Sequence, residues 1–519
     1  MREVPGLGSL TPTSRLLFAF LGTILLVPGL SCYSKPDANT LVMLIESSPT
    51  NLDPRIGIDA QSERIDNLIF DDLLSRGDDL NVAPGLAERW DIPDPLTFIF
   101  HLHRGAKFHD GRPLTSRDVK WTFDSLLQGK IRSTKAAVYK FVDHIDAPDD
   151  ATVVFHMKEP DATLLWNLSD GAMGIVPYAS GDEITLHPIG SGPFKFVSAE
   201  TDREVVLERN DDYWREKAKV GRVRFAVVPD ETTEALELRK GSGDIAINSL
   251  TPDTVVTLAR NPNLAVDTGG GTRLAYLGFN LRDPILQDVR VRQAIAYALD
   301  RKPMIEYLWR GEAQPARSVL PVQSWAYNGD VPPYLHDPDK AKQLLDAAGY
   351  REVNGVRFHI TMKTSTDANT RLMVAVMQQQ LRDVGIALDI RSFEFATFFS
   401  DVQHGAFQMY GLRWIGGNED PDIFEYAFHS SKFPPNGANR DYYFNPKVDA
   451  LIDKARREID PKLRKPLYAD VQQILADDLP YINLWYLDNV LVHTKRVQGI
   501  KLNAAGNYDF LRTAEIVSH

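Results

Sequence analysis

The residues with the greatest catalytic potential form an acidic stretch in the second half of the chain, where Glu419, Asp420 and Asp422 stand close together. A hydrolase that uses paired carboxylates needs them on either side of one substrate bond. The sequence does not place these side chains in space, and an exposed acidic loop explains them equally simply. Hydrolysis by Glu419 and Asp420 therefore stands as one alternative function.

Other polar clusters predict neither catalysis nor metal binding. His109 and Asp110 are adjacent, so on an extended segment their side chains point to opposite faces, and the Asp-Gly pair that follows indicates a turn. The glycines at 269–271 lack the lysine of a phosphate-binding loop, so we expect a loop or hinge there. The histidines are scattered without cysteines or carboxylates at metal-ligand spacing. We therefore expect no cofactor and no metal.

Size and composition indicate a protein with more than one hydrophobic core. The chain has 519 residues, of which 43% are hydrophobic. Single cores stop growing near about 250–300 residues, so we expect two large lobes. The net charge is −12, without a long run of Lys and Arg, which argues against a nucleic-acid partner. We expect a monomer.

The N-terminal segment predicts export to the periplasm or cell envelope. Residues 16–27 are apolar but shorter than the ~20 residues that span a bilayer, as in a signal peptide. Cys32, the only cysteine, follows shortly after, so no internal disulfide can form. Either Cys32 is the lipidated first residue of a lipoprotein, or the signal is cleaved conventionally, because Gly29 departs from the lipoprotein pattern. We expect a signal peptide over 1–31 and a tether over 32–40, with a lipid anchor at Cys32.

Apolar patterns predict alternating strands and helices in the remaining chain. Residues 41–45 form a continuous apolar run of strand length, and residues 358–362 form another strand. Helices are expected to begin after Asp288, Asp337 and Asn445, whose side chains can cap the first free N–H groups. This alternation predicts an α/β fold.

Short motifs spread along the chain carry a family resemblance. They are PGLAERW at 84–90, FHDGRPLT at 108–115, GSGPF at 190–194, LERNDDYW at 207–214 and DVRVRQAIAYALDR at 288–301. In this order and spacing, the chain resembles the extracytoplasmic solute-binding proteins of ABC importers, specifically the oligopeptide/dipeptide-binding family (family 5). The resemblance covers nearly the whole chain after the signal segment. It implies a carrier and not an enzyme.

The resemblance also implies the architecture. We expect a two-lobed periplasmic-binding-protein clamp of α/β class (type II, cluster C-like) with an extra inserted subdomain. The expected segments are 41–81, 188–278 and 485–519 for lobe I, 82–187 for the inserted subdomain of lobe I, and 279–484 for lobe II. Two crossing strands, near 274–280 and 482–486, would form the hinge about which the lobes close on a ligand.

The ligand contacts that the resemblance implies centre on Trp414. Members that bind a peptide by its ammonium group often have an Asp three positions after such a Trp, but here that position is Gly417. Either Glu419 or Asp420 takes its place, or the ligand has no ammonium group there. Trp414 itself is either a flat cleft wall or a core residue. The other expected ligand contacts are Gly416, Asn418, Ser47, Ser48, Tyr276 and Trp325.

Taken together, these features predict an envelope lipoprotein that captures a peptide or peptide-like solute and delivers it to an ABC permease. A broad-range peptide binder grips the ligand backbone and leaves side chains in wet pockets, where waters adapt to different residues. One alternative is a carrier of a non-peptide solute, such as an oligosaccharide, an opine-like conjugate or a metal chelate. The other is the envelope hydrolase that uses carboxylates.

Overall fold

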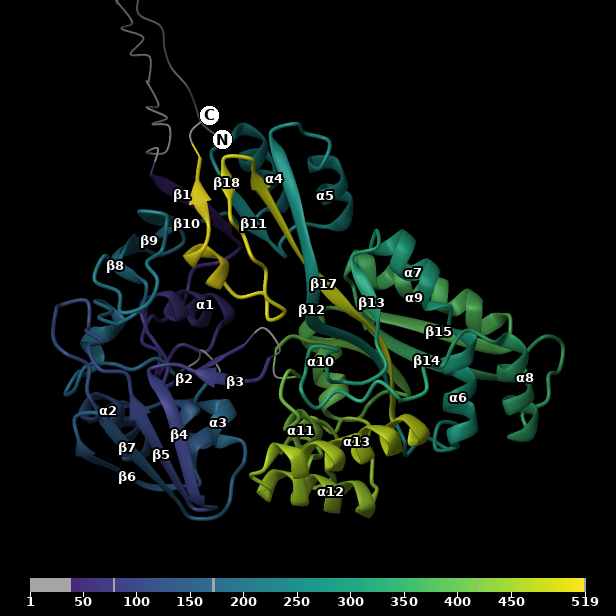
Figure 1. The fold of residues 1–519 in the computed structure, drawn as a ribbon. Helices are drawn as coiled ribbons and strands as arrows, with labels where there is room; N and C mark the ends of the chain where they lie inside the picture. Colours follow the sequence, from purple (N-terminus) through teal and green to yellow (C-terminus); the bar gives the residue numbers. More distant parts are fainter. Residues whose placement is uncertain (1–38, 78–79, 170–172, 417, 518–519) are drawn as a thin grey trace, which may run out of the picture.

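The computed structural model describes residues 39–77, 80–169, 173–416 and 418–517. The chain forms two broad masses that lie side by side (Figure 1). The predicted signal peptide, almost all of the tether, and Cys32 lie outside the described residues. Within the described part of the chain, no helix has both the length and the apolar character that a membrane crossing requires.

One half of the main sheet is built around β1 (Thr40–Ile45), the apolar run predicted from the sequence. Every residue of β1 is buried, as expected for a strand that has parallel neighbours on both sides. The other strands of this half are β11 (Ile245–Ile247), β10 (Arg222–Val227), β9 (Glu204–Arg209) and β8 (Phe194–Glu200). Its helices are α1 (Ala60–Ile69), α4 (Glu231–Lys240) and α5 (Pro252–Leu258).

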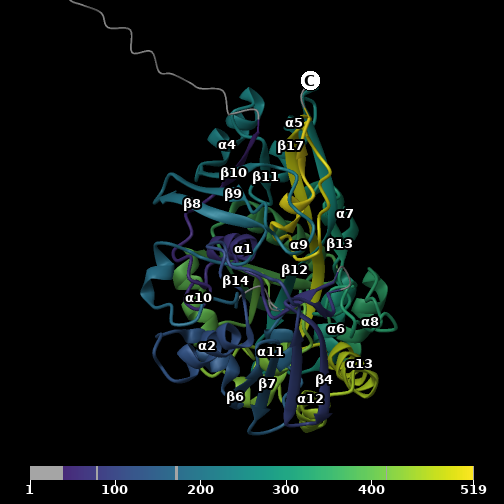
Figure 2. The ribbon, with the colours of Figure 1, turned by 60° about the vertical axis from the view of Figure 1, so that its left-hand side comes forward.

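Two long antiparallel strands, β12 (Leu264–Phe279) and β17 (Tyr481–Thr494), connect the two halves of the sheet (Figure 2). The C-terminal part of β17 pairs with β11, and its N-terminal part pairs with β13 (Ala313–Pro315). Each half therefore shares these strands. The predicted division of the chain into lobes cuts both strands, and its boundaries stay a prediction.

The other half of the sheet contains β14 (Phe358–Ser365), β15 (Ile386–Phe393) and β16 (Met409–Trp414), so that the strand order is β15-β14-β16-β12-β17-β11-β1-β10-β9-β8. The helices of this half are α6 (Val289–Ala298), α7 (Arg301–Leu308), α8 (Pro338–Ala347), α9 (Ala368–Arg382), α10 (Phe395–Gln403), α11 (Ile423–Phe428), α12 (Pro446–Arg457) and α13 (Pro461–Asp478). Asp288, Asp337 and Asn445 accept hydrogen bonds from the first turns of α6, α8 and α12, which confirms the predicted helix starts.

A separate antiparallel sheet lies within the predicted inserted subdomain. Its order is β4 (Ala87–Asp94), β5 (Thr97–Leu102), β7 (Thr152–Met157) and β6 (Val142–Asp149), and α2 (Ser116–Leu127) packs against β6 and β7. Short elements complete the fold: β2 (Leu74–Arg76), β3 (Val82–Pro84), α3 (Leu164–Asn167), β18 (Val497–Gln498), β19 (Glu515–Ile516), and the 3-10 turns Thr134–Tyr139, Asp182–Thr185, Ser430–Lys432 and Asp509–Arg512. The alternation of strands and helices confirms the α/β class.

Two motifs singled out in the sequence have structural roles. Burial lowers the pKa of His109 to about 4, and its Nε2 atom lies 3.1 Å from the carbonyl oxygen of Gly192, so His109 packs as a neutral ring. Residues 269–271 were expected in a loop or hinge; the loop was wrong, because these glycines lie within β12, and the hinge stays a prediction. A Cβ atom on Gly271 would come within 2.3 Å of the Leu487 carbonyl oxygen. Sequence patterns do not reveal a strand at this point, because glycines have no side chains that could alternate between polar and apolar.

Candidate functional site

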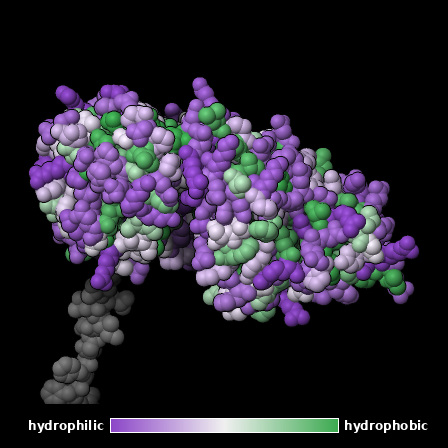
Figure 3. All heavy atoms as spheres, turned by 90° about the horizontal axis from the view of Figure 1, so that it is seen from below, coloured by the Kyte–Doolittle hydropathy of each residue, from purple (hydrophilic) through white to green (hydrophobic). Residues whose placement is uncertain are grey.

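A cavity of about 580 Å³ lies where segments far apart in the sequence meet. Its walls come from α1, from the segment around β2, from the middle of β12, from the loop after β16, and from the C-terminal segment 501–513. Seen from below, the two masses of the molecule meet along a hollow (Figure 3). The volume falls in the ~300–1,000 Å³ range of small-molecule sites.

An ion pair between Arg76 and Glu419 joins opposite walls of this cavity. The Nη1 atom of Arg76 lies 2.6 Å from Oε2 of Glu419, and both side chains are largely buried. The second carboxylate oxygen of Glu419 accepts a hydrogen bond of 2.8 Å from the Thr272 hydroxyl. Both oxygens of Glu419 are therefore engaged, and its negative charge is compensated within the protein.

Four cationic side chains line the cavity without an ion pair to any described residue: Arg64, Arg215, Arg273 and Lys501. Arg273 donates from Nη2 to the Asn248 side chain and to the Asp488 carbonyl oxygen, each at 3.0 Å, and its buried Nε has no partner among the described residues. Burial, with the positive charges of Arg413 and Arg64, lowers the pKa of Arg273 to about 10. These cationic side chains therefore favour an anionic group in the cavity.

Asp72 is the carboxylate of the cavity wall that has no hydrogen bond or ion pair of its own among the described residues. Its neighbour Asp71 is instead engaged by Ser191, Tyr213 and Trp214. Burial and the charge of Asp71 raise the pKa of Asp72 to about 7. A ligand cation placed beside Asp72 would supply the direct partner that no described residue provides.

Two of the aromatic residues predicted from the sequence, Tyr276 and Trp414, do not line the cavity. Tyr276 is only 2% exposed and packs against Tyr481 and Tyr410 in the core. The partly buried ring of Trp414 stacks on Tyr276, with centroids 6.1 Å apart. Ile415, the next residue, is 70% exposed and lines the cavity. Trp414 thus combines a packing role with a position one residue from the cavity.

The segment after Trp414 is divided between the cavity and the interior. Gly416, with a φ of +74°, lines the cavity, and Gly417 lies outside the described residues. Asn418 is buried and donates from Nδ2 to the carbonyl oxygens of Thr272 and Val319. Asp420 is buried behind the wall, where burial raises its pKa. Of the two carboxylates predicted from the sequence to contact the ligand, Glu419 lines the cavity and Asp420 does not.

The remaining predicted contacts lie elsewhere. Ser47 is exposed, and the Ser48 hydroxyl accepts a hydrogen bond of 2.7 Å from the Asp202 backbone N–H. Trp325 packs edge-on against Tyr468, with centroids 6.3 Å apart. These three residues do not line the cavity in this structure.

Sequence reasoning missed most of the polar wall. Arg64, Asp72 and Arg273 lie within or beside apolar patterns and belong to none of the motifs singled out above, and the C-terminal segment 501–513 contains no motif. The one available signal was the position of Asp72 directly after the apolar stripe of α1, beside a second carboxylate. Two adjacent carboxylates in an apolar environment repel each other and lose solvation, which shifts their pKa values. Shifted pKa values are common at functional sites, so this pattern suggests one.

Comparisons with known proteins agree with this architecture. Residues 81–435 match the model of a family described as bacterial extracellular solute-binding proteins, family 5 middle. The chain is similar to the dipeptide-binding protein of Escherichia coli, with 26% identity over 506 residues, 91% of this chain and 94% of that protein. It is also similar to a putative ABC transporter peptide-binding protein of Brucella ovis, with 31% identity over 445 residues, 83% of each.

A solved structure shows the same fold. The periplasmic binding protein DppA of Helicobacter pylori, described as ABC transporter-associated and in complex with the peptide STSA, is 28% identical and superposes with a TM-score of 0.72. The match covers 92% of this chain and 98% of that chain. These findings confirm both the predicted family and the predicted periplasmic-binding-protein fold. The chain belongs to the bacterial extracellular solute-binding proteins of family 5.

Proposed function

We propose that this protein binds a short peptide or peptide-like solute in the cavity of about 580 Å³ and delivers it, chemically unaltered, to an ABC permease. Two relatives described above are named as peptide-binding proteins, and a third was solved with a peptide. The observation that carries the proposal is that a carboxylate, Asp72, and two cations, Arg64 and Arg273, line the same cavity without an ion pair to any described residue.

This combination of charges matches the termini of a free peptide. A peptide ammonium group beside Asp72 and a carboxylate beside Arg64 and Arg273 would each form charge-assisted hydrogen bonds, which are about twice as strong as neutral ones. Glu419 is unsuited to the ammonium role, because Arg76 already compensates its charge. We therefore assign the role expected at Gly417 to Asp72.

The excess of cations refines the ligand class. Among the described residues that line the cavity, four cations (Arg64, Arg215, Arg273 and Lys501) and two carboxylates (Asp71 and Asp72) have no ion pair. A solute with more negative than positive groups fits this balance, for example an acidic peptide or an opine-like conjugate that carries several carboxylates. Such a conjugate is the second candidate, and the same assay distinguishes it from a peptide.

The geometry gives no support to hydrolysis by Glu419 and Asp420. Asp420 is buried behind the wall, where its Oδ1 atom accepts a hydrogen bond of 2.7 Å from the Asp422 backbone N–H. Glu419 is held by Arg76 and Thr272. The two carboxylates therefore do not face one substrate from opposite sides, as a paired-carboxylate hydrolase requires.

The proposal also includes features outside the described residues. Relatives in this family are extracytoplasmic, and we propose that this protein is a monomer anchored to the outer face of the membrane through lipidated Cys32. Trp414, Gly416, Gly417 and Asn418 remain proposed contributors to ligand binding, as Ser47, Ser48, Tyr276 and Trp325 do if the lobes move on closure.

The test is a thermal-shift and calorimetry survey of soluble protein that begins after Cys32. The protein is unfolded and refolded to remove any bound solute, and released material is identified by mass spectrometry. Trialanine is compared with its N-acetylated form, with its C-terminal amide, and with Ala-Glu-Ala. We expect each blocked peptide to bind about 10-fold or more weakly than the free peptide, and the acidic peptide to bind most tightly.

Three outcomes would contradict the proposal. If blocked and free peptides bind equally, Asp72, Arg64 and Arg273 do not bind the charged ends of the peptide. If no peptide binds but a carboxylated sugar conjugate or a metal chelate does, the ligand class is wrong. If mass spectrometry shows any added peptide cleaved by the pure protein, and Glu419→Gln abolishes the cleavage, the protein is a hydrolase.

A further inference from the structure

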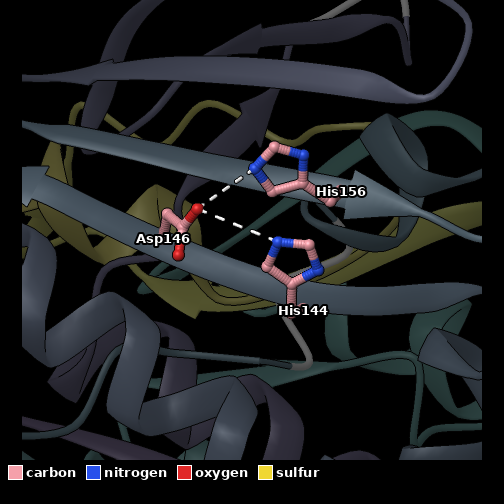
Figure 4. Close-up of side chains that lie close together, drawn as sticks. All are labelled: His144, Asp146 and His156. Carbon is pink, nitrogen blue, oxygen red and sulfur yellow. Dashed lines mark ion pairs between the residues drawn. The ribbon is translucent and has the colours of Figure 1, made fainter.

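The outer face of the inserted sheet brings together a group of side chains that the sequence leaves apart. His144 and Asp146 lie on β6, and His156 lies on β7, directly opposite His144 in the strand register (Figure 4). Their neighbours Ile145 and Phe155 point the other way, into the core beneath the sheet. The pleat of the two strands therefore holds all three side chains on the solvent side.

A break in the strand register contributes to this arrangement. The pairing of β6 with β7 is irregular between Val142 and His144. Val142 is buried, yet His144, two residues later, is exposed, whereas in a regular strand both would share one face. Such bulges re-aim side chains and are enriched next to functional sites.

The distances suit a common metal ion. Oδ2 of Asp146 lies 3.3 Å from Nε2 of His156 and 3.8 Å from Nε2 of His144, and all three candidate ligand atoms lie within 4.8 Å of one another. Tetrahedral zinc binds nitrogen and oxygen ligands at about 2.0–2.2 Å, which places ligand atoms roughly 3.3 Å apart. Two imidazoles and one carboxylate are donors that Zn²⁺ and Ni²⁺ accept.

His144 has a second contact of the kind found around bound metals. Its Nδ1 atom lies 2.9 Å from Oδ2 of Asp143. A proton shared on that side leaves the lone pair of Nε2 facing Asp146. Histidine ligands of metals usually donate their other N–H to a carboxylate, which sets the tautomer and the ring orientation.

The rings must rotate before they can share an ion. The imidazoles of His144 and His156 are stacked, with centroids 4.3 Å apart and planes 10° from parallel, whereas a metal lies in the plane of each ring that binds it. The side chains are 54% and 33% exposed. Rotation about the terminal torsion, which is broad for histidine, is therefore open to both.

We propose that His144, Asp146 and His156 form a surface site for one divalent transition metal ion, Zn²⁺ or Ni²⁺, separate from the ligand cavity. Asp143 positions His144, and the remaining coordination positions are filled by water. This departs from the expectation of no metal site, because the three ligands are spread over two strands and have no motif spacing. None of the three lines the cavity.

The test uses untagged protein that has been stripped with a chelator and dialysed. Zinc and nickel are titrated by calorimetry and in competition with a chromophoric chelator. We expect one metal equivalent, with binding abolished by His144→Ala or His156→Ala and weakened about 10-fold by Asp143→Asn. His101→Ala is the matched control, since this histidine lies on the same sheet and contacts one carboxylate, Asp91, at 2.8 Å.

Several results would overturn the site. They are no saturable metal binding, unchanged binding in both histidine variants, or an equal loss in His101→Ala. Circular dichroism and the thermal midpoint check that each variant is folded, which the exposure of these side chains favours. Peptide binding by His156→Ala is measured in parallel and should equal that of the unmodified protein, so failure of the metal site leaves the proposed ligand function untouched.

Discussion

Replacing Asp72 with asparagine should make the protein more stable and at the same time a weaker binder. In the folded protein, burial and the charge of Asp71 raise the pKa of Asp72 from 3.8 to about 7. A raised carboxyl pKa means that the protonated form is favoured by folding. The stabilisation is fully present below the unfolded pKa and is lost as the pH rises through about 7. Asparagine imitates the protonated form at every pH.

The size of the effect follows from that shift. A difference of about 3 pKa units corresponds to about 4 kcal/mol at 1.36 kcal/mol per unit. Because Asp72 is only partly buried, solvent screening reduces this figure, and we expect Asp72→Asn to stabilise the protein by roughly 2 kcal/mol at pH 8. At pH 5 the native carboxyl is already largely protonated in the folded state, so the gain should be smaller.

Binding should change in the opposite direction. Loss of one charge-assisted hydrogen bond, worth about 1.5–3 kcal/mol, weakens the affinity for a free peptide by about 10-fold to 100-fold. In the unmodified protein, the same affinity should fall as the pH drops below about 7, because Asp72 becomes protonated. N-acetylated peptides should show neither effect. Thermal unfolding at pH 5 and pH 8 and calorimetry with both peptides measure these quantities.

Glu234 provides a matched control. Burial raises its pKa to about 7 as well, and it accepts a hydrogen bond of 2.7 Å from Ser249, outside the cavity. Glu234→Gln should therefore increase stability at pH 8 without changing peptide affinity. The reasoning about Asp72 is refuted if its asparagine variant is less stable at pH 8, or if it binds the free peptide as tightly as the unmodified protein does.

Three further changes test other parts of the molecule. Glu419→Gln removes the charge that holds Arg76 across the cavity, so peptide affinity should fall about 10-fold, and small-angle scattering should show a more open ligand-bound form; an unchanged profile and affinity would contradict this role. Trp414→Ala should lower stability by about 2–3 kcal/mol through loss of its packing on Tyr276, with a smaller change in affinity; the reverse ranking would show that the ring is a ligand wall. Cys32→Ser should abolish the incorporation of a labelled fatty acid into the protein, whereas a conventionally cleaved protein would take up no label in either form.

The local structure of this protein was accessible from the sequence because it depends on neighbouring residues. The buried strand β1 appears as an apolar run, and the caps at Asp288, Asp337 and Asn445 appear as side chains placed just before helical patterns. The order of short motifs identified the family, since each motif specifies a turn or helix of the common fold. The strand conformation at 269–271 could not be predicted, because glycine has no side chain to produce an alternating hydrophobic pattern.

The ligand cavity and the metal site could be recognised only in three dimensions. Asp72 and Arg273 are about 200 positions apart in the chain, and both line the cavity because β12 crosses between the two halves of the sheet. His144 and His156 become neighbours on one face through the pairing of β6 with β7, and a register break after Val142 makes that face the exposed one for His144. Sequence patterns report which residues are buried and where elements begin. Electrostatics and coordination depend on distances between side chains, and those distances are set by tertiary packing.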